Sequence, residues 1–600
     1  MREKLRKTLR EKAYEIIVIL ICVAISCVFV SLKEGFHMDE LLSFELANAE
    51  FNPWIVTTQP EGRLAKFVHN EIDGETFGET MSNLYAVVKD VLQNRGGSKL
   101  LSYTADVYEE PVWITGEQFY DYITVEDEDA FNYLSVYFNV KDDNHPPLHF
   151  MLLHTISSIF QGKISHWMGC MINLAAVVWV LILLYRICDI LACELGLGSM
   201  GRRIGLMTAL YYGLSAGAVA TVLLIRMYGM VTLWCVLYFY LIIKKWQADS
   251  FDKKNTGLIL VTVLGFWTQY FFLFYCLLLA FTTAVCLLKN RRRKEMTGFV
   301  RSMAAAAFLG LAVFPFAFSD VFSSERGVEA LGNLSQGLGG YGARLFAFWR
   351  ILLTREAETY TLAMIALLAV FVLAGHIAGK KSERLQSVEN VDLDPAKVRG
   401  RRELLWMLLF PVAGYFLLAS RMSPYLVDRY IMPLFPFVAL ILMLTVFGLL
   451  AKVKEKYAEK HYRCLTETVC GILILFQVWN LVSYDGSYLY KGYSEQLKTA
   501  AEYQGYACIC VYNGVGYYEN LQEFTYYEKS LLLTLEELEN REEQDSIDGL
   551  EQIVVLIKSN VDESKVLEIL TENYGFKLER EVWYEPSAYG DEVFILGKDT

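Results

Sequence analysis

The sequence predicts a polytopic α-helical membrane protein with a small soluble α/β domain at its carboxyl end. The 600 residues are 54% hydrophobic, with a mean hydropathy of +0.29, and the apolar residues gather in runs of membrane-spanning length. Residues 485–600 differ, because they alternate short strand-like runs with a helical stretch at 563–574. The strand-like runs are 507–512, 552–557, 577–584 and 592–596. These patterns predict membrane helices followed by an exported domain.

Residues 1–32 combine a basic amino end, 1–12, with the first apolar run. A signal peptide would have a shorter apolar region and a cleavage site of small residues, so we expect this run to remain as an anchor. Basic flanks favour the cytoplasmic side. The amino end is therefore predicted to lie in the cytoplasm.

Residues 33–165 form a long acidic, aromatic-rich loop on the outer side. The loop is too long for a simple connector, and 81–91 has helical periodicity, so we expect it to fold over the membrane surface. Near its end, Pro146 and Pro147 suit the start of a helix. The apolar stretch after them either crosses the membrane or lies in its outer leaflet, and we prefer the second placement because it is short.

Residues 166–484 contain the other predicted spans, which with the anchor make about eleven: 168–190, 203–222, 228–245, 257–272, 274–289, 299–318, 359–378, 403–421, 430–450 and 466–484. With this assignment, six basic turns fall on the cytoplasmic side, as the positive-inside rule requires. The net charge of -13 is unevenly distributed, and we expect membrane lipids but no nucleic acid as partners. The 12 cysteines form neither a disulfide framework nor a metal–thiolate pattern.

The candidate chemistry begins with Asp39 and Glu40, at the point where the first span should emerge into water. An ionised carboxylate within hydrogen-bond reach of a hydroxyl or amine can remove its proton as a new bond forms. The alternative is a solvated acidic pair beyond a helix end. Asp39 is our preferred general base, and Glu40 a supporting or metal-facing residue.

Several short motifs of 13–450, in their order and common outer location, resemble the protein O-mannosyltransferase and aminoarabinose-transferase group, glycosyltransferase family 39. They are Asp39-Glu40, His145-Pro146-Pro147-Leu148, Arg226-Met227-Tyr228, Thr268-Gln269-Tyr270-Phe271-Phe272, and Asp428-Arg429-Tyr430 with Pro433 and Pro436.

The resemblance implies a GT-C fold, an outer active-site cavity and a sugar donor carried on a polyprenyl phosphate. It also implies that Asp39 is the base of an inverting single displacement, with Glu40 as its motif partner. Two features depart from the family: it often has a histidine in the stretch where this chain has Gln269, and the first loop is larger than in many members.

A polyprenyl phosphate leaving group needs fixed positive charge, and the planar fork of arginine suits phosphate oxygens. Arg226 and Arg429 lie at the outer ends of predicted spans, where a charged residue is a functional candidate. The alternatives are contact with lipid headgroups or pairing with Asp428. His145 could orient the phosphate, ligate a metal, or cap the helix that Pro146 begins.

Gln269, Tyr228, Tyr270 and Tyr430 are candidate substrate contacts because they lie beside these motifs; membrane-interface tyrosines are the alternative. Magnesium or manganese could be held between the donor phosphate and Asp39 or Glu40, because phosphate and carboxylate oxygens suit these ions. No dedicated ligand cluster in the sequence requires such an ion.

The predicted function is therefore transfer of a sugar from a polyprenyl-phosphate donor at the extracytoplasmic face of the plasma membrane. The donor sugar and the acceptor (protein, lipid or polysaccharide) stay open. A transporter or flippase of lipid-linked glycans is the alternative, but it should show paired halves with interrupted helices or midplane charges. A sensor with an exported ligand-binding domain would not need the acidic, histidine and arginine set.

Overall fold

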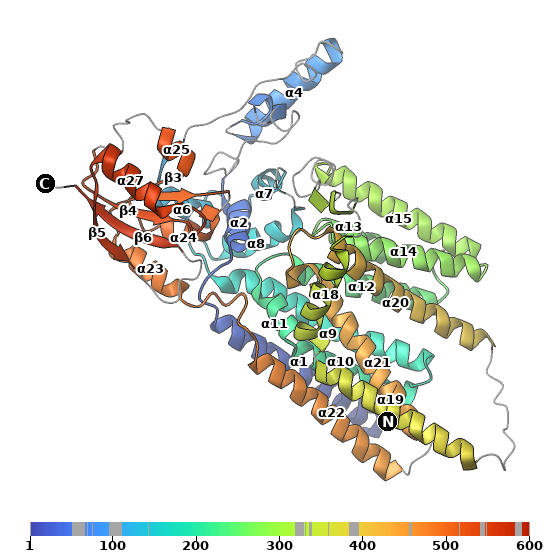
Figure 1. The fold of residues 1–600 in the computed structure, drawn as a ribbon. Helices are drawn as coiled ribbons and strands as arrows, with labels where there is room; N and C mark the ends of the chain where they lie inside the picture. Colours follow the sequence, from blue (N-terminus) through green and yellow to red (C-terminus); the bar gives the residue numbers. More distant parts are fainter. Residues whose placement is uncertain are drawn as a thin grey trace.

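The computed structural model describes residues 2–50, 67–94 apart from 69 and 75, 111–317 apart from 142 and 144, 329–382 apart from 331, 335–338 and 358, 395–454, 459–540 apart from 515, 547–582 apart from 548, and 591–598. Long helices form a bundle, and a mixed sheet with its own helices lies beside one end of it (Figure 1). The amphipathic helix α4 (Phe77–Asn94) projects from the same end of the molecule.

Within the described residues, eight helices are long and apolar enough to cross a membrane, which supports a multi-pass membrane protein. They are α1 (Arg2–Ser31), α9 (His166–Glu194), α12 (Tyr228–Gln247), α14 (Phe272–Lys289), α15 (Arg293–Val313), α20 (Pro395–Met422), α21 (Phe435–Lys454) and α22 (Glu459–Val482).

Two bent helix pairs raise the number of spans to ten, if each pair counts as one. The first joins α10 (Gly201–Gly213) to α11 (Ala216–Leu223) at an angle of 57°, and the second joins α18 (Tyr341–Leu352) and the turn after it to α19 (Thr359–Ser382). The predicted span 257–272 corresponds to a shorter helix, α13 (Thr256–Phe266), followed by a turn. Eleven residues rise only about 16 Å, about half of a bilayer's hydrocarbon core, so α13 is not among the helices long enough to cross a membrane.

The break between α10 and α11 has a local cause in the sequence. Ser215 has an extended backbone, and its side chain accepts a hydrogen bond from the amide of Ala218 at 3.0 Å, which makes it the N-cap of α11. Helix α11 then ends at Leu223, and the chain runs extended through Leu224 before α12 begins. Arg226 therefore lies in a short irregular connection between two helices.

The first long loop folds into short helices, as expected: α2 (Met38–Asn48), α6 (Gly116–Ile123), α7 (Tyr133–Asn139) and α8 (Leu148–Ile159). Helix α8 is 12 residues long, about 18 Å. Its first amide donates to the carbonyl of Trp267 at 3.0 Å, and beyond its end Gly162 donates to Val125, next to α6, at 3.0 Å. One end of α8 thus contacts the turn after α13, and the other end contacts the first loop. Its placement in the outer leaflet stays a prediction.

The sheet has six strands in the order β1-β3-β2-β4-β6-β5, with β2 parallel to both β3 and β4 and the other pairings antiparallel. Its strands are β1 (Trp113–Thr115), β2 (Ala507–Tyr512), β3 (Lys529–Thr534), β4 (Gln552–Ile557), β5 (Lys577–Val582) and β6 (Glu592–Gly597). The helix α27 (Glu563–Tyr574) agrees with the prediction for 563–574. The α/β character predicted for 485–600 is confirmed, with β3 as a strand that the sequence pattern did not reveal.

The sheet also includes a strand from outside the carboxyl-terminal segment. Strand β1 belongs to the first loop and pairs with β3, where Trp113 lies opposite Leu531. Next to it, the buried Phe119 of α6 packs on Phe524 with ring centroids 5.0 Å apart. The domain is therefore joined to the loop that carries α2, so two segments far apart in sequence share one core.

Candidate active site

Asp39 lies in the first turn of α2, and the sequence fixes that turn with its own caps. His37 is the N-cap: its Nδ1 accepts from the amide of Asp39 at 3.0 Å. The carboxylate of Glu40 reaches back to the amide of His37 at 2.8 Å, which completes a capping box. The positive end of the helix dipole therefore lies beside the Asp39 carboxylate.

The Glu40 side chain is fully buried and engaged on all sides. Its Oε2 lies 3.0 Å from Nζ of Lys33, and its Oε1 accepts from the amide of Ile225 at 2.7 Å. Burial raises the pKa of Glu40, while the positive charge of Lys33 opposes that effect. These contacts tie together the end of α1, the start of α2 and the connection that carries Arg226.

The Asp39 carboxylate pairs with Arg429, which comes from a 3-10 turn at Asp428–Tyr430 almost 400 residues later in the chain. The Asp39 side chain is 20% exposed and that of Arg429 13%. The carboxylate also lies 3.5 Å from the Nδ1 of His37. Asp39 is therefore partly exposed, whereas its neighbour Glu40 is fully buried.

Arg226 is the second cation of the site. Its Nη1 donates to the carbonyl oxygen of Asp39 at 3.0 Å and to Oγ of Ser43 at 2.7 Å. Its Nη2 lies 3.3 Å from the ring nitrogens of His145, and Nδ1 of that ring lies 2.9 Å from Oδ2 of Asp143. The structure thus brings the Asp39, Arg226, His145 and Arg429 motifs into one group, which we call the Asp39 centre.

The charges around Asp39 decide its protonation. Burial raises the pKa of the Asp39 carboxyl, but the charges of Arg226 and Arg429 outweigh burial and hold it below its usual range. Burial is also the main influence on His37, and it lowers the pKa of that ring to about 4. At neutral pH the ionised Asp39 therefore lies beside a neutral His37.

The predicted aromatic residues pack around the Arg429 turn. Tyr430 stacks on Phe271 with ring centroids 5.2 Å apart and meets the edge of Tyr228 at 6.3 Å. The guanidinium of Arg429 lies 5.5 Å from the Tyr430 ring centroid. Tyr228 and Tyr430 are mostly buried, so their packing holds the arginine in place.

The turn 268–271 joins this packing through Phe271 rather than through its polar side chains. The Oε1 of Gln269 accepts from the amide of Tyr270 at 2.7 Å, so it closes its own turn. Gln269 is buried, and Tyr270 packs with Phe266 at 5.7 Å between ring centroids. As substrate contacts, Gln269 and Tyr270 stay predictions.

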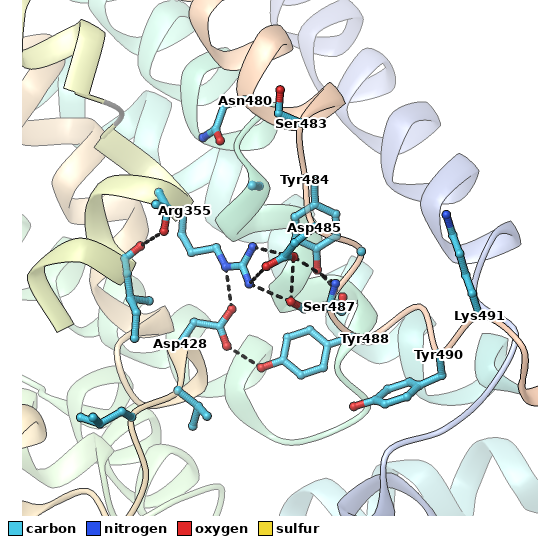
Figure 2. A pocket seen from close by; sticks show the side chains of 16 residues that line it. Arg355, Asp428, Asn480, Ser483, Tyr484, Asp485, Ser487, Tyr488, Tyr490 and Lys491 are labelled. Carbon is cyan, nitrogen blue, oxygen red and sulfur yellow. Dashed lines mark hydrogen bonds and ion pairs between the residues drawn. The ribbon is translucent and has the colours of Figure 1, made fainter. Parts of the chain in front are cut away.

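A cavity of about 1000 Å³ lies beside the Asp39 centre (Figure 2). Arg355 crosses it, with Nε donating to Asp428 at 2.9 Å, two bonds to Asp485 at 3.2 and 3.3 Å, and one to Ser487 at 3.0 Å. The hydroxyl of Tyr488 donates to the same Asp428. The sequence analysis named none of these as site residues except Asp428, as a possible partner of an arginine, because the group forms only from three distant segments.

Metal binding has no geometric support within the part of the chain that the structure describes: no group of three or more histidine, cysteine, aspartate or glutamate residues there could hold an ion. The two predicted metal-facing carboxylates are occupied by protein donors. Asp39 pairs with Arg429, and Glu40 with Lys33 and two backbone amides. Magnesium or manganese at this site stays a prediction.

No family model matches the chain, and no curated protein matches it. Among solved structures, it is similar to the crystal structure of ArnT from Cupriavidus metallidurans bound to undecaprenyl phosphate, with a TM-score of 0.45 and 10% identity over 75% of this chain and 88% of that one. The apo crystal structure of the same protein gives a TM-score of 0.41 and 10% identity, over 75% and 87%. A similarity at this level describes the arrangement of the chain and assigns neither substrate nor reaction.

Proposed function

We propose that this chain is a membrane glycosyltransferase that moves a sugar from a polyprenyl-phosphate donor to an acceptor, with Asp39 as general base. The observation that carries the proposal is the Asp39 centre itself. It pairs an ionised, partly exposed carboxylate with Arg429, while Arg226 bonds to the backbone carbonyl of the same aspartate and lies next to His145. The four residues come from four segments of the chain. A carboxylate with a fixed cationic pair suits proton removal opposite a phosphate leaving group.

In the proposed reaction the acceptor oxygen or nitrogen forms a bond to C1 of the sugar while the bond from C1 to the phosphate oxygen breaks. The bonding electrons leave with the polyprenyl phosphate, and the Asp39 carboxylate takes the proton of the acceptor. One displacement inverts the configuration at C1. Arg429 and Arg226 offset the charge that develops on the phosphate.

The ion pair between Asp39 and Arg429 gives the donor a second role. The arginines lower the pKa of Asp39, which keeps it ionised but makes it a weaker base. A donor phosphate that engages Arg429 would draw part of that positive charge away from Asp39 and raise its proton affinity. Base strength then rises only when the donor is bound.

Glu40 and His145 are supporting residues in this proposal. Glu40 anchors the α2 turn through Lys33, and the His145 ring lies between Arg226 and Asp143. No step is assigned to a metal. Tyr228 and Tyr430 hold the Arg429 turn by packing.

We place the centre at the extracytoplasmic face. The connection at Leu224–Met227, the start of α9 and the end of α1 meet there, as the bond from Asn173 Nδ2 to Leu224 at 2.6 Å and the Lys33 pair indicate. The basic turns after α12 and α14 occupy the opposite ends of their helices. The positive-inside rule assigns those ends to the cytoplasm.

The test uses the purified full-length protein in nanodiscs with a panel of polyprenyl-phosphate sugars and envelope acceptors. Release of free polyprenyl phosphate that depends on acceptor is the expected result, and Asp39→Asn should lower it by about a hundredfold or more. Arg463→Gln, at an exposed ion pair on α22, is the matched control and should behave as wild type. Full activity in Asp39→Asn would remove the base assignment, and translocation of an intact donor without release would favour the transporter alternative.

A further inference from the structure

The cavity beside the Asp39 centre has a chemistry that differs from a phosphate site. Four charged residues line it among those that the structure describes. Asp428 and Asp485 both pair with Arg355, and the exposed Lys491 lies at the rim. The charges balance, two positive against two negative. A phosphate entering this space would meet two carboxylates, so the cavity favours an uncharged polar ligand.

The wall formed by residues 484–491 presents flat rings and hydrogen-bonding groups to this space. Tyr484, Tyr488 and Tyr490 line it, each with an apolar ring and a hydroxyl (Figure 2). Asn480 also lines it from the end of α22. Asn480 is only 7% exposed, and its amide nitrogen has no hydrogen-bond partner among the residues that the structure describes. A buried donor without a partner is costly unless a ligand or water satisfies it.

The same wall holds two tyrosines in a strained backbone conformation. Tyr488 has φ of 71° and Tyr490 of 49°, in the left-handed region that residues with a Cβ rarely occupy. Such strain costs about 1–3 kcal/mol per residue and persists where the surroundings impose it, often at ligand sites. Here the surroundings are specific: Lys33 donates to the carbonyl of Tyr488 at 2.7 Å, and Glu34 donates to that of Leu489 at 2.8 Å.

The wall also reaches the Asp39 centre directly. Tyr490 packs against His37, the N-cap of α2, with ring centroids 6.0 Å apart. Asp428 borders the cavity and is followed in the chain by Arg429, the partner of Asp39. The cavity therefore borders residues that contact Asp39, although Asp39 itself is not among the residues that line it.

We infer that this cavity is the acceptor subsite and that it binds a saccharide. Tyrosine rings offer apolar faces to sugar C–H groups, and the Asn480 amide offers a hydrogen bond to a sugar hydroxyl. A volume of about 1000 Å³ is large enough for an oligosaccharide segment. This inference rests on the proposed glycosyltransferase function and narrows its acceptor from protein, lipid or polysaccharide to a glycan.

The test measures binding of four trisaccharides, mannotriose, maltotriose, cellotriose and chitotriose, to the full-length protein in nanodiscs by saturation-transfer NMR and calorimetry. At least one should bind saturably. Asn480→Ala should weaken that binding about tenfold, the cost of one hydrogen bond of about 1.4 kcal/mol. The matched control is Asn560→Ala, an exposed asparagine of the α/β domain, and it should leave binding unchanged.

A second variant separates loss of the cavity from loss of the fold. Ser483 lines the cavity and is exposed, so Ser483→Trp should fill the space, abolish trisaccharide binding and leave the melting temperature unchanged. Absence of binding by all four sugars, or equal binding in both cavity variants, overturns the inference. Displacement of the sugar by farnesyl phosphate also overturns it, because the cavity would then belong to the donor.

The variant Asp39→Asn distinguishes this inference from the proposed function. Asp39 does not line the cavity, so trisaccharide binding should persist in that variant. Binding without any transfer in the wild type would contradict the proposed function alone. Transfer to another acceptor class without saccharide binding would contradict the acceptor subsite alone.

Discussion

Asp39 and Glu40 are adjacent in the chain but occupy two different environments. Glu40 points into the bundle, where Lys33 and two amides enclose it, while Asp39 is 20% exposed and faces Arg429. Successive residues of a helix point about 100° apart, so a one-residue step is enough to separate them. The difference shows how one helical turn can hold a structural carboxylate and a chemically available one.

Among the changes that test this difference between Asp39 and Glu40, Arg429→Gln should have the largest effect, and the quantity affected is the transfer rate. The change removes the cation that faces Asp39, and with it a fixed charge for the donor phosphate. We expect the transfer rate to fall by about 10²–10³-fold, as for loss of one preorganised charge partner. Initial rates with the donor that the wild type accepts would check this, with Arg463→Gln as control. A rate within about threefold of wild type, a barrier change of less than about 1 kcal/mol, would contradict the role of Arg429.

Glu40→Gln should act on stability instead. It leaves Lys33 buried beside a neutral amide, and breaking a buried ion pair costs about 3–5 kcal/mol. The melting temperature in detergent should fall strongly, and the double variant Lys33→Met with Glu40→Gln should recover part of the loss. If the double variant melts at the temperature expected from adding the single effects, the two residues are not coupled.

The pH dependence of stability should report on the cap of α2. Burial lowers the pKa of His37 from 6.5 to about 4, so between these values the unfolded chain binds a proton that the folded chain does not. Stability therefore falls as pH falls through this window. The lowered pKa of Asp39 adds a further loss only below its usual titration range.

Melting curves between pH 7 and 4 test this prediction. In His37→Asn the cap acceptor is kept but the titrating ring is gone. The variant should lose less stability than wild type across the window. Identical slopes for both proteins would show that His37 does not contribute.

The smallest effect is expected at the exposed pair of Arg463 and Glu467 on α22. The two side chains are 68% and 63% exposed and four residues apart, with Nε to Oε1 at 2.9 Å. Such a pair contributes about 0.3–0.5 kcal/mol at most, and salt screens it. Arg463→Gln should thus shift the melting temperature far less than Glu40→Gln. A comparable shift would remove the contrast between buried and exposed charge.

Much of the fold followed from local sequence patterns. Long apolar runs predicted the spans, because a bilayer requires that length, and alternating strand patterns predicted β2, β4, β5 and β6. The short β1 was not predictable: three residues carry no periodic signal, and only pairing with β3 makes them a strand. The bend at Ser215 was not predictable either, because residues 203–222 form one continuous apolar run in the sequence.

For the candidate site, the sequence by itself determined the motifs at Asp39, His145, Arg226 and Arg429 and the kinds of side chain that they supply. Only the tertiary structure decided that the four lie together, that Glu40 is closed off by Lys33, and that residues 484–491 form the wall of a cavity. The physical reason is the sequence distance over which each interaction acts. Caps and hydrophobic periodicity act over a few residues, whereas an ion pair between positions 39 and 429 depends on how every intervening helix packs.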